Sequence, residues 1–224
     1  MEGDSLVVEV PILYEDNHLL VIEKPAGMLS QGDLSGDLDV LTVLKQLIKT
    51  RDNKSGNVFL GLVHRLDRPV GGTMVIAKTS KAAGRLSTQF RERTTTKIYH
   101  AVVTGTPVEK EATVIHHLVK DRQHRITRIA KHGKHAELKY RVVDAMPDRS
   151  LLEVILLTGL SHQIRAQLSA LGHPILGDHK YGATIPYRKG SIALFATHLS
   201  FSHPTKKTPV EIDVELPSRW PFTS

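Results

Sequence analysis

Asp67 lies among several cations in a segment rich in turn-forming residues. The segment 64–69 reads HRLDRP, and Gly71 and Gly72 follow it closely. Neighbouring cations favour the ionised form of a carboxyl group, and an ionised carboxylate held in a loop can act as a nucleophile or a general base. The alternative is a structural loop in which Asp67 caps a turn and pairs with an arginine. The spacing makes Asp67 a candidate catalytic residue and leaves both readings open.

Arg165 is the centre of a second constellation, residues 157–165 (LTGLSHQIR). If Ser161 caps a helix over 162–171, Arg165 falls in its first turns, where the helix dipole disfavours a cation. The sequence therefore predicts a carboxylate or phosphate partner for Arg165; the alternative is an arginine that reaches solvent. The apolar residues expected to form the buried face of this helix are Ile164, Leu168 and Leu171.

Lys97 and Tyr99 are two residues apart in an apolar run, so strand alternation places both side chains on one face. Tyr99 could stack on a nucleobase from that face, and a tyrosine of the hydrophobic core is the other reading. The histidines do not suggest a metal: His116 and His117 would point to opposite faces of a strand, and residues 132–135 lack a nearby acidic ligand. No metal site is predicted.

Several classes of chemistry are excluded by what the sequence lacks. The chain has no cysteine, which rules out thiol nucleophiles, thiolate zinc sites and iron–sulfur clusters. The HRLD segment is not accompanied by a P-loop or by a glycine-rich phosphate loop, so the motifs that phosphoryl transfer needs are missing. The sequence also has no dinucleotide fingerprint, and no cofactor is predicted.

Positive charge is concentrated in two stretches. The net charge is +7, yet residues 78–97 and 120–135 each contain six Lys or Arg against one acid. Such concentration is what binding to a polyanion requires, because each neutralised phosphate releases counterions; two solvated faces are the alternative. The candidates for contacts with a nucleic-acid backbone are Arg85, Arg91, Arg93, Arg122, Arg125 and Arg128.

The elements that must position these residues are mostly short strands. Strands are predicted at 7–13, 18–23, 73–77, 97–103, 112–118, 136–143, 151–157, 192–201 and 210–214. Helices are predicted at 38–50, 81–91 and 162–171, with caps at Asp37 or Asp39, at Ser80 and at Ser161. Most connections are too short for a crossover helix, so we expect an α+β fold with a central mixed, largely antiparallel sheet flanked by helices.

The chain shows no repeat and no linker, so residues 1–224 are expected to form a single domain. It has no apolar run of about 20 residues, and its start lacks the pattern of a signal peptide. A cytoplasmic protein without membrane association is therefore expected, and nothing in the sequence requires more than a monomer.

Five motifs, in order, resemble the RluA-type RNA pseudouridine synthases. They are residues 14–28 (YEDNHLLVIEKPAGM), 64–67 (HRLD), 97–99 (KIY), 158–165 (TGLSHQIR) and 172–182 (GHPILGDHKYG). The resemblance covers roughly residues 14–204. It implies a pseudouridine synthase fold and an isomerase that acts on uridine in tRNA or ribosomal RNA without cofactor or metal. The target uridine would be flipped out of a loop or stem–loop.

The resemblance also implies roles for residues of the site. Asp67 would be the catalytic carboxylate, either attacking C1′ or removing the C2′ proton; Arg165 would pair with it; and Tyr99 would stack on the uracil and could take the C5 proton. Contacts with substrate or RNA would come from His64, Arg65, Arg68, Lys97, His162, Gln163 and Ile164.

Two departures from the family pattern concern RNA contacts. Val70 and Gly71 replace a Thr-Ser pair that members commonly carry, and Leu160 replaces an arginine. The first motif starts near Tyr14, so an N-terminal S4-like RNA-binding domain is not expected. The alternatives are a non-catalytic RNA-binding protein on the same scaffold, and a nucleoside or glycoside hydrolase that uses Asp67.

Overall fold

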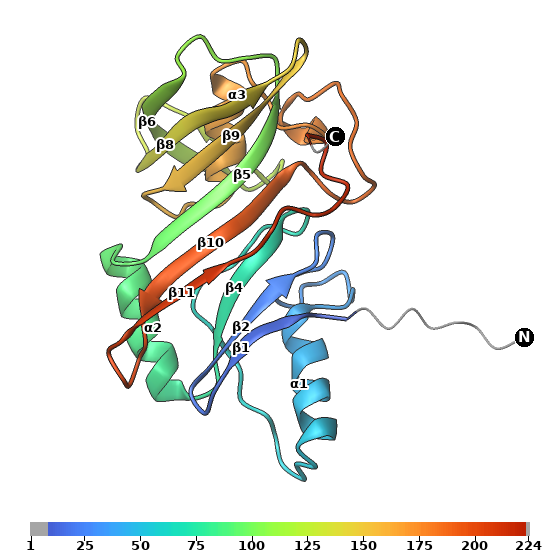
Figure 1. The fold of residues 1–224 in the computed structure, drawn as a ribbon, viewed down its shortest axis with the longest axis vertical. Helices are drawn as coiled ribbons and strands as arrows, with labels where there is room; N and C mark the ends of the chain where they lie inside the picture. Colours follow the sequence, from blue (N-terminus) through green and yellow to red (C-terminus); the bar gives the residue numbers. More distant parts are fainter. Residues whose placement is uncertain (1–8, 223–224) are drawn as a thin grey trace, which may run out of the picture.

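The computed structural model describes residues 9–222 and arranges them around one sheet (Figure 1). The strands are β1 (Ile12–Glu15), β2 (Leu19–Lys24), β3 (Gly61–Leu62), β4 (Gly71–Ala77), β5 (Thr96–Thr104), β6 (Glu111–Asp121), β7 (Ile126–Ile129), β8 (Lys134–Ala145), β9 (Arg149–Leu156), β10 (Leu194–Ser202) and β11 (Pro209–Asp213). Their order is β1-β2-β4-β10-β5-β9-β8-β6-β7, with β3 beside β4 and β11 beside β10. Among these pairs only β4 and β10 run parallel, which confirms the expected mixed, largely antiparallel sheet.

Three α-helices and one 3₁₀ turn accompany the sheet. They are α1 (Val40–Arg51), α2 (Ser80–Glu92), α3 (Gln163–Ala170) and η1 (His179–Tyr181). Of the two predicted caps of α1, Asp37 and Asp39, it is Asp39 that caps the helix, by accepting two backbone N–H groups. The predicted cap of α2 at Ser80 is wrong: Thr79 caps it by accepting the N–H of Ala82, one residue earlier. No helix of the described residues is long and apolar enough to cross a membrane.

The two faces of β2 and β4 are both buried, and each face carries a helix. Leu20 and Ile22 pack with α1 in one hydrophobic cluster, whereas Leu19 and Val21 pack with α2 in another. Since successive side chains of a strand point to opposite faces, the continuous apolar run of β2 serves both clusters. The third helix, α3, packs on the other half of the sheet, against β6 and β7.

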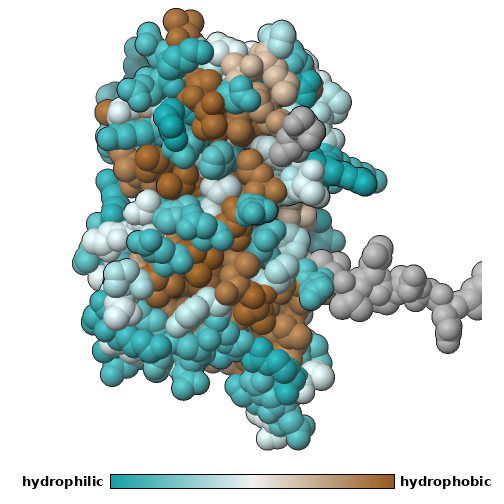
Figure 2. Space-filling model, in the orientation of Figure 1, coloured by the Kyte–Doolittle hydropathy of each residue, from teal (hydrophilic) through white to brown (hydrophobic). Residues whose placement is uncertain are grey.

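Polar side chains cover much of the face shown in Figure 2, and apolar side chains emerge between them in separate patches. The predicted strand at 7–13 lies partly outside the described residues; within them the first strand is β1.

One short strand, β7, was missed, and two local predictions about α3 are wrong, for reasons that the structure shows. β7 was not predicted, because its residues lie within a basic stretch; in the fold, the Thr127 N–H donates to the Tyr181 hydroxyl at 2.8 Å and joins β7 to η1. Ser161 does not cap α3: the position before the helix is His162, in the left-handed region with φ +54°, and it makes no side-chain cap bond. Leu171, expected in the buried face of α3, is 39% exposed.

Candidate active site

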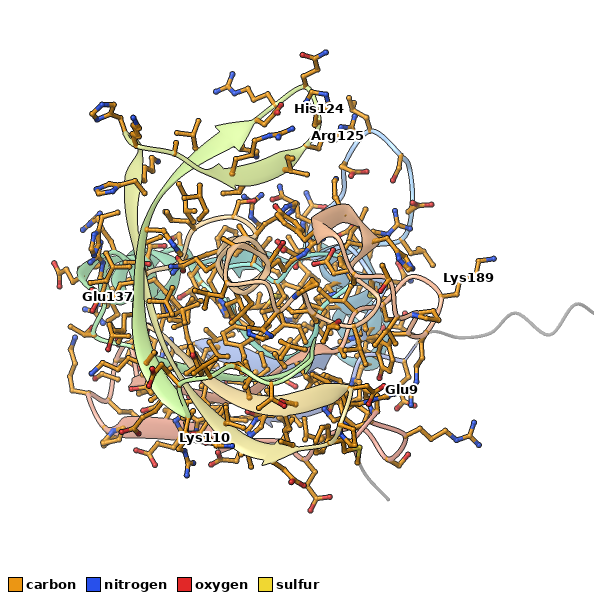
Figure 3. The ribbon with its side chains drawn as sticks, turned by 90° about the horizontal axis from the view of Figure 1, so that it is seen from above. Glu9, Lys110, His124, Arg125, Glu137 and Lys189 are labelled. Atoms are coloured by element: carbon orange, nitrogen blue, oxygen red, sulfur yellow. The ribbon has the colours of Figure 1, made fainter. Side chains whose placement is uncertain are left out.

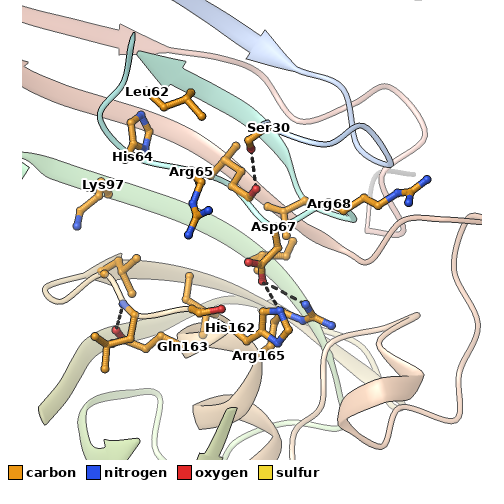
Figure 4. A pocket seen from close by; sticks show the side chains of 18 of the residues that line it. Ser30, Leu62, His64, Arg65, Asp67, Arg68, Lys97, His162, Gln163 and Arg165 are labelled. Carbon is orange, nitrogen blue, oxygen red and sulfur yellow. Dashed lines mark hydrogen bonds and ion pairs between the residues drawn. The ribbon is translucent and has the colours of Figure 1, made fainter. Parts of the chain in front are cut away.

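A pocket of about 750 Å³ brings together the three residues predicted to be catalytic (Figure 4). Asp67 comes from the loop between β3 and β4, Tyr99 from β5 and Arg165 from α3. The volume lies within the range of about 300–1,000 Å³ that is typical of ligand sites. Segments far apart in the sequence therefore converge on one cavity beside the sheet.

Arg165 is 4% exposed and bridges two carboxylates. Its Nη1 donates to Asp67 Oδ2 at 3.1 Å. Its Nε and Nη2 donate to the two oxygens of Asp178 at 2.6 and 2.8 Å, the bidentate geometry that suits a guanidinium. The predicted carboxylate partner of Arg165 is confirmed. Asp178, itself 2% exposed, was not predicted as a partner, although it lies in the fifth motif.

The backbone on both sides of Asp67 is fixed by buried donors. The Ser30 hydroxyl donates to the carbonyl of Leu66 at 2.8 Å. On the other side, the carbonyl of Arg68 accepts from the N–H of Gly27 at 2.8 Å and from Lys24 Nζ at 3.3 Å. Asp67 is thus held in a loop whose position is set from outside it, which is the pre-organisation that chemistry at a carboxylate needs.

Lys24 is completely buried and connects this loop to the end of β2. Besides Arg68, its ammonium donates to the carbonyls of Met28 at 2.6 Å and Pro25 at 2.9 Å. Burial lowers the pKa of Lys24 to about 7, and the charge of Asp67 opposes that shift. Sequence reasoning did not single out Lys24, because nothing local shows that a lysine at a strand end will be covered on all sides.

We expect Lys24→Met to destabilise the fold by roughly 2–4 kcal/mol, because it leaves buried carbonyl groups without donors. Turnover should fall as well, since the Arg68 carbonyl loses a donor that holds the Asp67 loop. Urea denaturation and a single-turnover assay measure the two effects. A variant as stable and as active as the wild type would contradict this account of Lys24.

Tyr99 and Lys97 lie on the same face of β5, as predicted, and both are 7% exposed. Tyr99 belongs to the main hydrophobic cluster and also lines the pocket. Its position therefore fits both alternatives, a tyrosine of the hydrophobic core and a ring available to a substrate. Burial raises the pKa of Tyr99, and the charge of Asp67 adds to the shift. The phenol is therefore neutral at physiological pH, and it offers the pocket a ring and a hydroxyl donor.

His162 lies beside the Asp67–Arg165 pair. Its Nε2 is 3.8 Å from Asp67 Oδ2, and its Nδ1 is 2.8 Å from the Tyr181 hydroxyl. That hydroxyl also accepts from the Thr127 N–H at 2.8 Å, so Tyr181 is held in place and keeps the imidazole with its Nε2 facing Asp67. Burial lowers the pKa of His162, with Asp67 acting in the opposite direction.

His64 stacks on Phe90 with ring centroids 4.5 Å apart. Its Nε2 accepts the backbone N–H of Val75 at 3.0 Å, which leaves Nδ1 as the protonated nitrogen. Burial lowers the pKa of His64 to about 3, and the charge of Lys97 adds to that shift. His64 is consequently a neutral donor over the whole physiological range.

The low pKa of His64 predicts a pH-dependent stability. Between about pH 3 and pH 6.5, His64 binds a proton in the unfolded state but not in the folded state. The contribution of His64 to the free energy of unfolding is therefore complete above pH 6.5 and is lost as the pH falls. His64→Gln keeps an acceptor for Val75 but does not titrate. Between pH 6 and pH 5 we expect the unfolding free energy of the wild type to fall by about 1.2 kcal/mol more than that of His64→Gln. Parallel curves in urea titrations would contradict this.

The predicted RNA-contact residues fall into two groups. The pocket is lined by His64, Arg65, Arg68, Arg93, Lys97, His162, Gln163 and Ile164, and also by Lys120, which was not predicted. Outside the pocket lining are Arg85, Arg91, Arg122, Arg125 and Arg128.

The surroundings of three of these residues qualify the roles predicted for them. Arg85 donates to the carbonyl of Pro204 at 2.8 Å and ties α2 to the turn between β10 and β11. Gln163 is 2% exposed, and its carboxamide is bonded to Thr158, Leu160 and Glu137; contact of these two with RNA stays a prediction. Ile164 belongs to the main hydrophobic cluster.

The departures at Val70 and Gly71 have a steric counterpart. A Cβ at Gly71 would lie 2.8 Å from the ring of Phe195 and 3.2 Å from the carbonyl of Lys24, so the ring fills the space that a side chain would take. Val70 is buried in the same hydrophobic cluster as Phe195. Leu160, partly buried, lines the pocket. Among the described residues, no group of three His, Asp or Glu side chains could hold a metal ion.

Comparison with known proteins places this geometry among RNA-modifying enzymes. The family model described as RNA pseudouridylate synthase matches residues 18–170. A relative from Vibrio vulnificus, ribosomal large subunit pseudouridine synthase C, is 33% identical over 92% of this chain and 65% of its own length. Ribosomal large subunit pseudouridine synthase D of Zymomonas mobilis is 33% identical over 94% of this chain and 70% of its own. The chain thus spans 65% of the length of the Vibrio vulnificus relative.

Solved structures of proteins named for the same domain have a similar fold. Human RNA pseudouridylate synthase domain containing 4 superimposes with a TM-score of 0.78 at 27% identity, covering 94% of this chain and 90% of that one. Human RNA pseudouridylate synthase domain containing 1 gives a TM-score of 0.76 at 26% identity, covering 97% and 87%. The expected fold is confirmed.

Proposed function

The chain belongs to the RNA pseudouridylate synthase family, and from that premise we propose that it isomerises uridine to pseudouridine in RNA, with Asp67 as the catalytic carboxylate. The observation that carries the proposal is the Asp67–Arg165 pair at 3.1 Å in a pocket that Tyr99 also lines. Arg165 donates a charge-assisted hydrogen bond to Asp67 and orients its carboxyl group. Asp178 holds the guanidinium from its other side.

The reaction breaks the N1–C1′ bond of uridine and joins C5 to C1′. C5 loses a proton and N1 gains one, so no oxidant, reductant or cofactor is consumed. Asp67 takes part either by attacking C1′ or by removing the C2′ proton to give a glycal. Since burial keeps the Tyr99 phenol neutral, it suits stacking on the detached uracil and donating a hydrogen bond better than it suits free-base chemistry.

We propose ribosomal RNA as the first substrate to test, because the two relatives compared above carry the name ribosomal large subunit pseudouridine synthase; tRNA is the second. The uridine must leave its stack to reach Asp67, so a loop or stem–loop is favoured over regular duplex.

The test is to incubate the protein, without cofactor or metal, with unmodified ribosomal RNA and tRNA. Pseudouridine is then mapped by carbodiimide-block sequencing, with Asp67→Asn in parallel. Sites that only the wild type produces support the proposal and identify the substrate. RNA binding without product would instead support a non-catalytic RNA-binding protein, and release of free uracil would indicate a hydrolase.

The β6–β7 hairpin supplies part of the proposed RNA surface. Figure 3 shows His124 and Arg125 at its tip, away from the body of the sheet. Arg125 and Arg128 are exposed, and Arg128 pairs with Asp121 at 3.1 Å. Lys120, on the same hairpin, lines the pocket. An RNA whose uridine enters the pocket would thus have its backbone close to this hairpin.

Reversing the charge of Arg125 and Arg128 to Glu should flatten the dependence of log K on log[salt]. Each lost phosphate contact is worth a slope of roughly 0.7–0.9. The matched control is Lys45→Glu with Lys49→Glu on α1, which removes the same charge from exposed positions outside the pocket lining. Filter binding measures the slope of log K against log[salt]. Equal slopes for the two double variants would show that the hairpin is a solvated face that does not contact RNA.

A further inference from the structure

Lys97 is a buried cation for which the described part of the chain supplies no anion. It is 7% exposed, and no described residue bonds its ammonium. A Cβ on Gly159 would lie 3.7 Å from Nζ, which places the ammonium beside the turn between β9 and α3. Burial lowers the pKa of Lys97, and the charge of Arg93 adds to the shift. Its Nζ is not among the fully buried unpaired atoms of the described residues, so the ammonium is open to the pocket that Lys97 lines. A largely desolvated cation without a partner costs stability, and a partner can reach it from outside the chain.

Lys24, the other deeply buried lysine of the site, shows the contrast. It is 0% exposed, against 7% for Lys97, and three carbonyl oxygens surround its ammonium. The fold therefore satisfies a buried lysine where the lysine serves the architecture. At Lys97 no described residue accepts from the ammonium, and the residue lines the pocket.

The groups around Lys97 are donors as well. Arg93, the C-terminal cap of α2 with φ +60°, also lines the pocket and lies close enough for its charge to act on Lys97. The ring of His64, close enough for the charge of Lys97 to act on it, has only its Nδ1–H left to offer. Figure 4 shows Lys97 and His64 at one end of the pocket, away from Asp67, His162 and Arg165 at the other. Donors without acceptors select an anion.

We propose that this end of the pocket, formed by Lys97, Arg93 and His64, is a subsite for a backbone phosphate next to the target uridine, with Lys97 as its principal donor. The inference rests on the proposed function, because it takes RNA as the ligand. It also states how the RNA is positioned: a phosphate bound to Lys97 determines which nucleotide of the RNA strand reaches Asp67. Free phosphate has the same chemistry, and the test separates the two sources.

The first expected result concerns stability. Lys97→Met removes an unpaired buried charge while keeping the apolar stem, so Tm should rise by about 2–4 °C. The control is Arg51→Met, which breaks an ion pair of 2.7 Å with Glu15 outside both basic stretches and outside the pocket lining; its Tm should fall and its RNA affinity should not change. A fall in Tm for Lys97→Met would show that the lysine has a structural role and would overturn the proposal.

The second expected result concerns RNA. The probe is a 17-nucleotide stem–loop with one uridine, in its loop, bound to proteins that carry Asp67→Asn so that no turnover occurs. Lys97→Met should weaken binding about 10- to 100-fold and lower the salt slope by about 0.7. A methylphosphonate, which is neutral, at one of the two phosphates flanking the uridine should weaken binding of the Lys97 protein by a similar factor. It should have no further effect on Lys97→Met.

This double cycle isolates the pairing of one lysine with one phosphate. If Lys97→Met and the methylphosphonate weaken binding independently, so that their factors multiply in the double change, the subsite is overturned. It is also overturned if Lys97→Met leaves RNA affinity unchanged and alters only competition by inorganic phosphate. Failure of the proposed function is read separately, from wild-type turnover on natural RNA. Coupling without turnover would keep the subsite and reject the synthase, whereas turnover without coupling would do the reverse.

Discussion

Asp67→Asn is expected to lower the rate of pseudouridine formation by at least about 10³-fold, because an amide can neither attack C1′ nor accept a proton. The geometry of the site should survive the change. Arg165 keeps its bidentate bond to Asp178, and the carbonyls on both sides of Asp67 keep their donors. RNA affinity should therefore stay within about tenfold of the wild type, because only one charge changes.

Single-turnover assays on the mapped uridine and equilibrium filter binding separate the two quantities. The control is Asp148→Asn, which removes an exposed carboxylate paired with Arg149 and outside the pocket lining. Its turnover should equal that of the wild type. Substantial turnover by Asp67→Asn would remove Asp67 from its proposed role, while a collapse of RNA affinity with it would assign the residue to binding.

Arg165→Met is expected to destabilise the protein by roughly 3–5 kcal/mol, because it leaves the buried Asp178 without its cation. Activity should be lost as well, since Asp67 loses the donor that orients it. Arg165→Lys keeps the charge but not the fork that engages both oxygens of Asp178, so it should fall between the wild type and Arg165→Met in both measurements.

A double variant tests the physical cause. Arg165→Met with Asp178→Leu removes both buried charges, so it should recover a large part of the stability lost by Arg165→Met alone. It should not recover activity. Urea denaturation of the three variants gives the comparison. A double variant no more stable than Arg165→Met would show that the loss came from packing and not from an unpaired carboxylate.

Much of the scaffold could be predicted, since its signals are local. The cap of α1 at Asp39 and the placement of Lys97 and Tyr99 on the same face of a strand depend on residues a few positions apart. The strands β2, β4 and β5 were predicted from short apolar runs rich in β-branched residues, a pattern that also lies within a few positions. Ser161 misled because a serine before a helix is a good cap in general, whereas here His162 takes up a left-handed conformation and bonds to Tyr181. No local pattern encodes that bond.

By itself, the sequence determined the order of the motifs, the carboxylate at Asp67 and the need of Arg165 for an anion. Only the tertiary structure decided which anion: Asp67 lies 98 residues away from Arg165, and Asp178 reaches it through the turn after α3. It also decided that Lys24 is saturated by carbonyls while Lys97 is buried without a partner. The reason is physical, because burial and pairing depend on which distant segments cover a side chain, and spacing along the chain does not record that.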